Sequence, residues 1–221
     1  MTVLRKSSFE TLPVEIVHRI FDYLPTETIV SSIRYVCKRF YSIISGYNNY
    51  EVDFRYMSRS DLCSMARIID PKNIISVTLS DEIQTPGQIR LFLTHFQIDQ
   101  FIRLRSLTLV KVNCKDIDQF QKHIIKCQLT TLSITLCDYY KNDPTALISS
   151  LISHSNLRKF EYIGNYKILR GIQWPIQCRL IHVIIGHCSF NILYSIIFHL
   201  PYLQTLVVKD IFSSVSVVTA D

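Results

Sequence analysis

Glycine is scarce in this sequence, since only 5 of its 221 residues are glycine. Loops that cradle phosphates or present a catalytic nucleophile depend on glycine for backbone angles that other residues rarely adopt. The chain also lacks the nucleotide-binding patterns G-x-x-x-x-G-K-[ST] and G-x-G-x-x-G, and the hydrolase patterns H-E-x-x-H and G-x-S-x-G. An enzyme would have to carry a site without these motifs. We therefore expect a protein with no catalytic residues.

Cysteine pairs of the C-x-x-C type are absent, although the chain has 7 cysteines. A disulfide framework or a zinc ribbon is therefore not predicted. The best metal candidate is the group Cys178, His182, His187 and Cys188, because Cys and His are good zinc ligands. A structural interpretation is stronger, since cysteine is often a small buried apolar residue. We expect neither a metal nor another cofactor.

A secretory leader is not visible, because the first four residues run directly into Arg5 and Lys6 without an apolar segment. We therefore expect the protein in the cytoplasm, the nucleus or both. Charged residues are absent from Leu180 to Val208, a length sufficient to span a bilayer. However, polar residues and Pro201 interrupt this charge-free run, and its apolar spacing changes from alternate to helical. We expect no membrane span.

The overall composition indicates a folded chain with an ordinary surface. Hydrophobic residues make up 48% of the sequence and charged residues 19%, so enough apolar surface exists to offset the entropy of chain ordering. The formal net charge of +6 comes from basic residues that are scattered and repeatedly interrupted by acids. A continuous basic surface is therefore not predicted, and we expect no nucleic-acid partner.

Three short helices are predicted in the first fifty residues. Pro13 suits the first position of a helix, and Glu15 places negative charge beside the positive end of that helix. Two further helices are predicted from about Thr26 and from about Val36. Their apolar residues recur at helical spacing. So small a module buries too little of its own surface to be stable alone, and its apolar rows require a larger helical core or a partner.

The residues of this segment resemble the F-box. The resemblance covers about residues 9 to 45 and rests on Leu12-Pro13-x-Glu15-Ile16-Val17-x-x-Ile20-Phe21-x-Tyr23-Leu24, followed by Val36-Cys37-Lys38-Arg39-Phe40. Phe40 stands where the family often has Trp, and Ile29 where it often has Leu. The resemblance implies eight residues in the small core of the module or in its contact with a Skp-family adaptor: Leu12, Pro13, Ile16, Ile20, Leu24, Val36, Cys37 and Phe40. The sequence does not separate these two roles.

A second pattern, L-x-x-L-x-L with apolar substitutions, recurs six times at starts 23 to 30 residues apart. The matches are Ile74-Val77-Leu79, Leu104-Leu107-Leu109, Leu129-Leu132-Ile134, Leu157-Phe160-Tyr162, Leu180-Val183-Ile185 and Leu203-Leu206-Val208. The spacing is typical of leucine-rich repeats. In three units Cys137, Asn165 and Cys188 stand at the Asn/Cys position of that repeat. Such units stack into a solenoid with a parallel sheet on its concave face.

Helical stretches are predicted between these strands. One follows Asp116, one follows Asp143-Pro144, and one runs from Phe190 to Leu200. In the unit from 157 to 180, the stretch 166–174 shows no clear helix, so an irregular segment is predicted there. The expected fold class is then α+β overall: a three-helix F-box at 1–48, a helical linker at 49–73, and an α/β leucine-rich-repeat solenoid at 74–221, which we expect to be truncated at its C-terminus.

The residues beside the inward-pointing motif positions are predicted to face the concave surface. In the early repeats these residues are hydroxyl-bearing and include Ser80. In the later repeats they form the candidate substrate-binding set: Lys159, Glu161, Ile163, His182, Ile184, Val207 and Lys209. Ile163, Ile184 and Val207 form a predicted apolar stripe with charged residues beside it. A protein or peptide fits such a surface better than a nucleic acid.

The combination of an F-box with leucine-rich repeats resembles a class of adaptors of cullin-RING ubiquitin ligases. It implies that the F-box binds the Skp-family adaptor and, through it, the cullin and RING subunits, while the repeats bind a protein substrate. The substrate itself is not identified by the sequence. Two alternatives remain open at this point, a scaffold that uses the F-box without promoting degradation and an enzyme with a hidden site.

Overall fold

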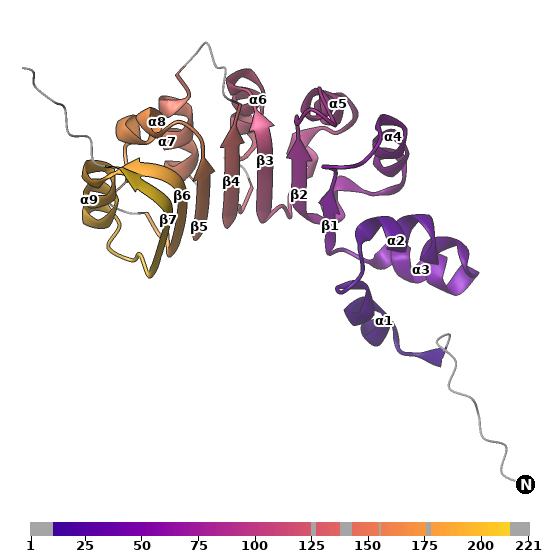
Figure 1. The fold of residues 1–221 in the computed structure, drawn as a ribbon. Coiled ribbons are helices and arrows are strands. Elements are labelled where there is room, and N and C mark those ends of the chain that lie inside the picture. Colours follow the sequence, from indigo (N-terminus) through magenta and orange to yellow (C-terminus); the bar gives the residue numbers. More distant parts are fainter. Residues whose placement is uncertain (1–10, 125–126, 138–142, 155, 176–177, 213–221) are drawn as a thin grey trace, which may run out of the picture.

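The computed structural model describes residues 11–124, 127–137, 143–154, 156–175 and 178–212. Within these residues, a small group of N-terminal helices is followed by a parallel sheet whose strands alternate with helices (Figure 1). The N-terminal helices are α1 (Val14–Phe21), α2 (Thr26–Ser31) and α3 (Lys38–Gly46), with a short 3-10 helix η2 (Ile33–Tyr35) before α3. The prediction of three short helices is confirmed.

Prolines set the beginnings of the first two helices. Pro13 and Pro25 occupy the N-cap positions of α1 and α2, with extended backbone angles, so Pro13 lies one residue before the position predicted from the sequence. Glu15 lies in the first turn of α1, where a negative charge complements the helix dipole. Cys37 caps α3 with a fully extended backbone (φ −158°, ψ 165°), which turns the chain between η2 and α3.

Within the described ranges, seven parallel strands form one sheet in simple chain order, from β1 to β7. The strands are β1 (Tyr50–Asp53), β2 (Ile74–Ser80), β3 (Ser106–Val112), β4 (Thr131–Leu136), β5 (Lys159–Ile163), β6 (His182–Ser189) and β7 (Thr205–Phe212). Figure 1 shows them side by side, with the N-terminal helices at the β1 end and β7 at the other. The fold is therefore mixed α/β with a parallel sheet, as the alternation of strand and helix patterns predicts.

The repeated L-x-x-L-x-L segments lie in register across six adjacent strands. The second motif residues form one row across the sheet, in which each residue pairs with the next: Val77, Leu107, Leu132, Phe160, Val183 and Leu206. The third motif residues form a parallel row, from Leu79 to Val208. In β2 to β6 both rows are buried, whereas the residues between them are partly exposed. One face of the sheet is thus covered and the other is open, which confirms the predicted direction of the motif residues.

Helices return the chain between successive strands and cover the buried face of the sheet. They are α4 (Arg59–Ile68), α5 (Gln88–His95), α6 (Cys114–Ile124), α7 (Thr145–His154), α8 (Tyr166–Gly171) and α9 (Phe190–His199). Short polar side chains cap several of them. Ser58 accepts from the amide of Asp61 at 3.2 Å, Asp143 from that of Thr145 at 2.9 Å, and Asn165 from that of Lys167 at 2.9 Å.

The N-terminal helices and the sheet share one hydrophobic core. Tyr50 of β1 stacks edge-on against Tyr47, with ring centroids 4.9 Å apart, and donates its hydroxyl to the carbonyl of Ile44 at 2.9 Å. Thr26 of α2 donates its hydroxyl to the carbonyl of Glu51 at 2.6 Å. These contacts attach the helical module directly to the first strand of the sheet.

Three expectations from the sequence are wrong in detail. The segment 49–73 is not a purely helical linker, because it contains β1 as well as α4, and the sheet begins one strand earlier than predicted. The segment 166–174, predicted to be irregular, contains the six-residue helix α8. Ser80 does not face the open side, because it is fully buried and receives a bond from the amide of Glu82 at 3.1 Å. The predicted C-terminal truncation concerns residues outside the described ranges.

None of the helices in the described ranges has both the length and the apolar character that a bilayer crossing requires. The charge-free run from Leu180 to Val208 instead forms β6, α9 and the first part of β7. The change from alternate to helical apolar spacing within the run marks the passage from β6 to α9.

Candidate functional site

The helices α1 to α3 form the N-terminal part of the shared hydrophobic core. Val17 and Phe21 of α1 pack with Ile29 and Val30 of α2, and Phe40, Ile43 and Ile44 of α3 complete this group, all nearly fully buried. Phe21 meets the ring of Tyr47 edge-on at 5.5 Å. Phe40, the residue that departs from the family's common Trp, is thus a core residue, and so is Ile29. An apolar side chain of similar size preserves the packing at both positions.

A second set of apolar side chains on the same helices is exposed to solvent. Ile16 is 40% exposed, Val36 is 65% exposed and Tyr23 is 89% exposed. Val14, Tyr35 and Tyr41 are also exposed. We call these six residues the exposed apolar surface of the module: Val14, Ile16, Tyr23, Tyr35, Val36 and Tyr41. The packing of the core does not use these six side chains, so they are available for contact with a partner.

The structure divides the eight residues predicted from the F-box resemblance between these two sets. Phe40 is buried in the core, whereas Pro13, Ile16 and Val36 are exposed. The other four residues are partly buried at the boundary between core and surface: Leu12, Ile20, Leu24 and Cys37. Sequence reasoning missed four of the exposed residues: Val14, Tyr23, Tyr35 and Tyr41. Their exposure could not be predicted, because helical spacing alone does not tell which apolar row faces inward.

Two arginines connect different elements of the module. Arg39 of α3 donates from Nη2 to the carbonyl of Leu12, which holds the start of α1 beside α3. Arg34 lies over the ring of Tyr41, 4.7 Å from its centroid, and donates from Nη2 to its hydroxyl at 3.2 Å. Arg34 Nε and Arg39 Nη1 are buried without a hydrogen-bond partner. The sequence motif contains Arg39, but the spacing gives no sign of its contact with Leu12.

The open face of the sheet carries the residues predicted to bind a substrate. One row across the last three strands consists of Lys159, His182 and Thr205, and the next consists of Glu161, Ile184 and Val207. Each member of these rows is at least partly exposed. Lys209 is also exposed, on β7. The later part of the face therefore combines apolar and charged groups as predicted, whereas the early strands present hydroxyls such as Thr78 and Thr108.

The predicted apolar stripe is not a single row. Ile184 and Val207 are direct neighbours across β6 and β7. Ile163 lies two residues further along β5 and pairs with Thr135 of β4, so it is diagonal to Ile184. Gly186 of β6 lies beside it, because a Cβ at Gly186 would be in ordinary contact with Ile163 Cγ2 at 3.5 Å. The stripe is thus bent towards the C-terminal ends of the strands.

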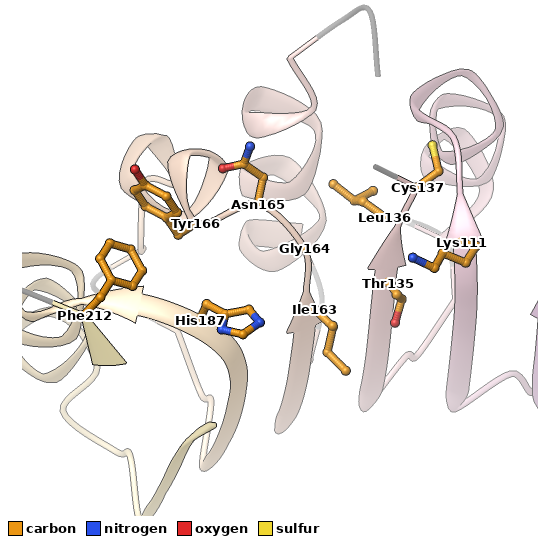
Figure 2. A pocket seen from close by; sticks show the side chains of 10 residues that line it. All are labelled: Lys111, Thr135, Leu136, Cys137, Ile163, Gly164, Asn165, Tyr166, His187 and Phe212. Carbon is orange, nitrogen blue, oxygen red and sulfur yellow. The ribbon is translucent and has the colours of Figure 1, made fainter. Parts of the chain in front are cut away.

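A hollow of about 500 Å³, with Ile163 among its lining residues, lies at the C-terminal ends of β3 to β7 (Figure 2). Its lining comes from five strands, the segments that follow β4 and β5, and the start of α8: Lys111, Thr135, Leu136, Cys137, Ile163, Gly164, Asn165, Tyr166, His187 and Phe212. Tyr166 and Phe212 meet edge-on at one side, with ring centroids 4.5 Å apart. His187 Nδ1 lies 3.0 Å from Asp210 Oδ2. Aromatic, cationic and amide groups therefore meet at one end of the open face.

Lys111 owes its position to an irregularity in β3. Its φ of 54° is left-handed, and the register with β4 shifts between Leu109 and Val112. A non-glycine residue in this region is uncommon, and bulges of this kind redirect side chains at the ends of strands. Neither Lys111 nor Val110, the residue before it, is a glycine or asparagine, so the sequence gives no sign of this irregularity.

The four residues considered for zinc are not arranged as a metal centre. Among the described residues, no group of three or more His, Cys, Asp and Glu side chains is placed to hold a metal ion. Cys178 and Cys188 are buried, and burial raises the pKa of both thiols. His182 and His187 are exposed on the open face. Cys188 thus occupies the structural position predicted for it, whereas Asn165 is exposed and caps α8.

Comparison with known families adds one finding. Residues 9–48 match the model of the F-box-like family. A comparison of the sequence with curated proteins finds no match. The chain therefore carries an F-box-like domain, formed by α1 to α3. This finding supports the interpretation of the chain as an F-box protein. Domains of this kind typically bind Skp-family adaptors, and they suggest the general role of an adaptor in a ubiquitin ligase of the Skp-cullin-F-box type.

Proposed function

We propose that this protein is a non-catalytic substrate-recognition subunit of a cullin-RING ubiquitin ligase. The F-box-like domain binds a Skp-family adaptor and, through it, the cullin and RING subunits. The segments with the L-x-x-L-x-L pattern are leucine-rich repeats whose open, concave face binds a protein substrate. The subunit contributes proximity, because it holds the substrate near a ubiquitin-conjugating enzyme that other subunits position.

The observation that carries this proposal is the exposed apolar surface of the F-box-like domain. A monomeric soluble domain rarely leaves a large group of apolar side chains uncovered, and such groups mark contacts with other proteins. Ile16 and Val36 belong to the residues that the resemblance assigns to adaptor contact, and both are exposed while the core beside them is complete. Burial of such anchors is the main source of affinity at protein interfaces.

The repeat part of the proposal is supported by spacing and register together. The motif recurs at 23 to 30 residues, which is close to the length of a leucine-rich repeat. Equivalent motif residues lie opposite one another from β2 to β7. The buried motif residues of successive units belong to one continuous core, as expected for stacked repeats. The partly exposed residues between the motif positions then offer a continuous surface for a partner.

Co-purification with a Skp-family adaptor tests the first half of the proposal. We expect Ile16→Asp combined with Val36→Asp to abolish the contact, and Leu12→Ala combined with Pro13→Ala to weaken it at least roughly thirtyfold, since a lost apolar anchor costs ~2–5 kcal/mol. Ile102→Asp is the matched control, because Ile102 is 62% exposed on a loop outside the domain. Circular dichroism must show an unchanged fold. Retained adaptor binding in the folded Ile16/Val36 variant would overturn the assignment.

The ligase role itself is tested in cells. We expect cullin and RING subunits to co-purify with the chain, and captured proteins to accumulate when the proteasome is inhibited. The Ile16/Val36 variant should still capture those proteins but lose the cullin. If captured proteins neither carry ubiquitin nor accumulate, the chain is a scaffold that uses its F-box without promoting degradation.

A further inference from the structure

Helix α9 is apolar on two sides. Its inner side faces the sheet, where Ile192 and Ile196 are buried. Its outer side exposes large side chains at positions i, i+4, i+7 and i+8, and one more follows just after the helix. We call these residues the outer stripe: Phe190, Tyr194, Ile197, Phe198 and Tyr202. Each is between 58 and 72% exposed.

The outer stripe is ordered as one surface. The rings of Tyr194 and Phe198 stack with centroids 6.2 Å apart and an interplanar angle of 16°. A surface helix normally turns a polar face to solvent, and a helix that is apolar on all sides is normally buried. Within the described ranges, no other element covers these side chains, so the stripe has the character of an interface.

The charge pattern favours contact between identical chains. Asp, Glu, Lys and Arg are absent from Leu180 to Val208, although the chain carries a formal net charge of +6. Two copies therefore approach at this face without like-charge repulsion between Asp, Glu, Lys or Arg of this segment. Helices that lie on membranes have Lys and Arg along their polar side, and α9 has none. A lipid surface is accordingly the poorer fit.

The exposed area is sufficient for a dimer of modest stability. Large aromatic side chains bury roughly 150–250 Å² each, so five side chains that are about two-thirds exposed offer on the order of 600 Å² per chain. Two such faces give on the order of 1,200 Å² in total, at the lower limit of specific protein interfaces.

We propose that the outer stripe of α9 binds the same stripe of a second copy of this chain, around a twofold axis. In such an isologous contact the central residue faces its own counterpart, and each end of the stripe faces the opposite end. Within α9 itself, Tyr194 lies midway between Phe190 and Phe198, and we place the axis beside it. The F-box-like domain lies at the other end of the sheet and stays free in both copies (Figure 1).

Sedimentation velocity of the purified full chain, from about 1 to about 200 μM, tests the dimer, since interfaces of this size are weak to moderate. We expect the dimer fraction to rise with concentration. Tyr194→Lys and Tyr194→Glu should each weaken dimerisation at least roughly tenfold, because they place like charges opposite each other across the axis. Tyr56→Lys is the matched control, because Tyr56 is as exposed as Tyr194 but lies near β1.

Mixing the two charged variants tests whether Tyr194 meets its own counterpart at the axis. An equimolar mixture of Tyr194→Lys and Tyr194→Glu chains should recover a heterodimer, since opposite charges then face each other there. Both variants keep the inner side of α9 unchanged and should retain the circular dichroism of the original chain. A monomer at all concentrations overturns the proposal, as does a dimer that neither charge weakens or a monomer that binds neutral lipid vesicles.

Discussion

The hydroxyl of Tyr47 donates to Asp22 Oδ1 across 2.8 Å, so the residue that follows α3 is tied to the residue that ends α1. The ring of Tyr47 lies edge-on to those of Phe21 and Tyr50. One aromatic group therefore joins the F-box-like domain to the first strand of the sheet. The domain packs directly against the sheet, because the hydrophobic core of the domain continues into the core of the sheet.

Tyr47→Phe should destabilise the protein by about 1 kcal/mol, since it removes the hydrogen bond to Asp22 but keeps the ring. Tyr47→Ala should cost about 3–5 kcal/mol, because it also leaves a cavity among Phe21 and Tyr50. Urea unfolding followed by circular dichroism measures both. Tyr35→Phe, at an exposed position of η2, should change little. Equal stability of Tyr47→Phe and the unchanged chain would show that the hydrogen bond adds nothing.

The junction should also weaken at high pH. Burial raises the pKa of Tyr50 from its ordinary value of 10.0 to about 12, and burial together with the bond to Asp22 raises the pKa of Tyr47 further. Above pH 10 the unfolded chain therefore loses these protons while the folded chain keeps them. The contribution of these two tyrosines to the free energy of unfolding should be constant below that pH and fall as the pH rises towards about 12. Denaturant melts across this range measure the decline, and it should be smaller in Tyr50→Phe.

Two glycines make a matched pair for testing close packing between α7 and α8. A Cβ on Gly171 would lie 2.6 Å from Thr145 Cγ2, whereas a Cβ on Gly46 would meet nothing within 4 Å. Gly171→Ala should destabilise the protein by about 1–3 kcal/mol through overpacking. Gly46→Ala, at the end of α3, should be neutral or stabilise by up to about 1 kcal/mol. Thermal melts of both variants give the comparison, and a neutral Gly171→Ala would mean that α8 shifts freely.

Substrate capture should depend on the later strands of the open face. Ile184→Asp places a charge between Glu161 and Val207 and should sharply reduce the set of proteins that co-purify, while adaptor binding is unchanged. Thr78→Asp, in the same row of side chains but on β2, is the control and should have little effect. Quantitative mass spectrometry of the captured proteins provides the measurement. Equal losses in both variants would place the contact on the early strands as well.

The strands were predictable where the sequence combines two signals. The first signal is alternation within a strand, since Val77 and Leu79 alternate with polar neighbours. The second is the return of this alternation at repeat spacing along the chain. Both signals give the same register. β1 was missed because Tyr50 to Asp53 form only four residues without the leading motif position. α8 was missed because six residues carry too little helical periodicity, although its cap, Asn165, is a typical one.

The candidate sites were less predictable, because exposure depends on tertiary packing. Ile16 and Val17 are adjacent and equally apolar, yet Val17 is buried while Ile16 is not, since only one side of α1 faces α2 and α3. Ser80 resembles the other hydroxyl residues of its strand, but it is fully buried at the end of β2, where its amide donates to Gln88 Oε1. The hollow near Lys111 depends on a backbone irregularity that no local residue pattern encodes.

The chain order of the strands also determines how the molecule can open. Each strand pairs only with the strand before it and the strand after it, so loss of β7 removes support from β6 alone. The β1 end is held by the aromatic group around Tyr47, whereas β7 has a strand neighbour on one side only within the described residues. Amide protons should therefore exchange with solvent fastest in β7 and progressively more slowly towards the middle strands. When a partner binds the F-box-like domain, local unfolding should therefore begin at β7, the end of the sheet furthest from that partner.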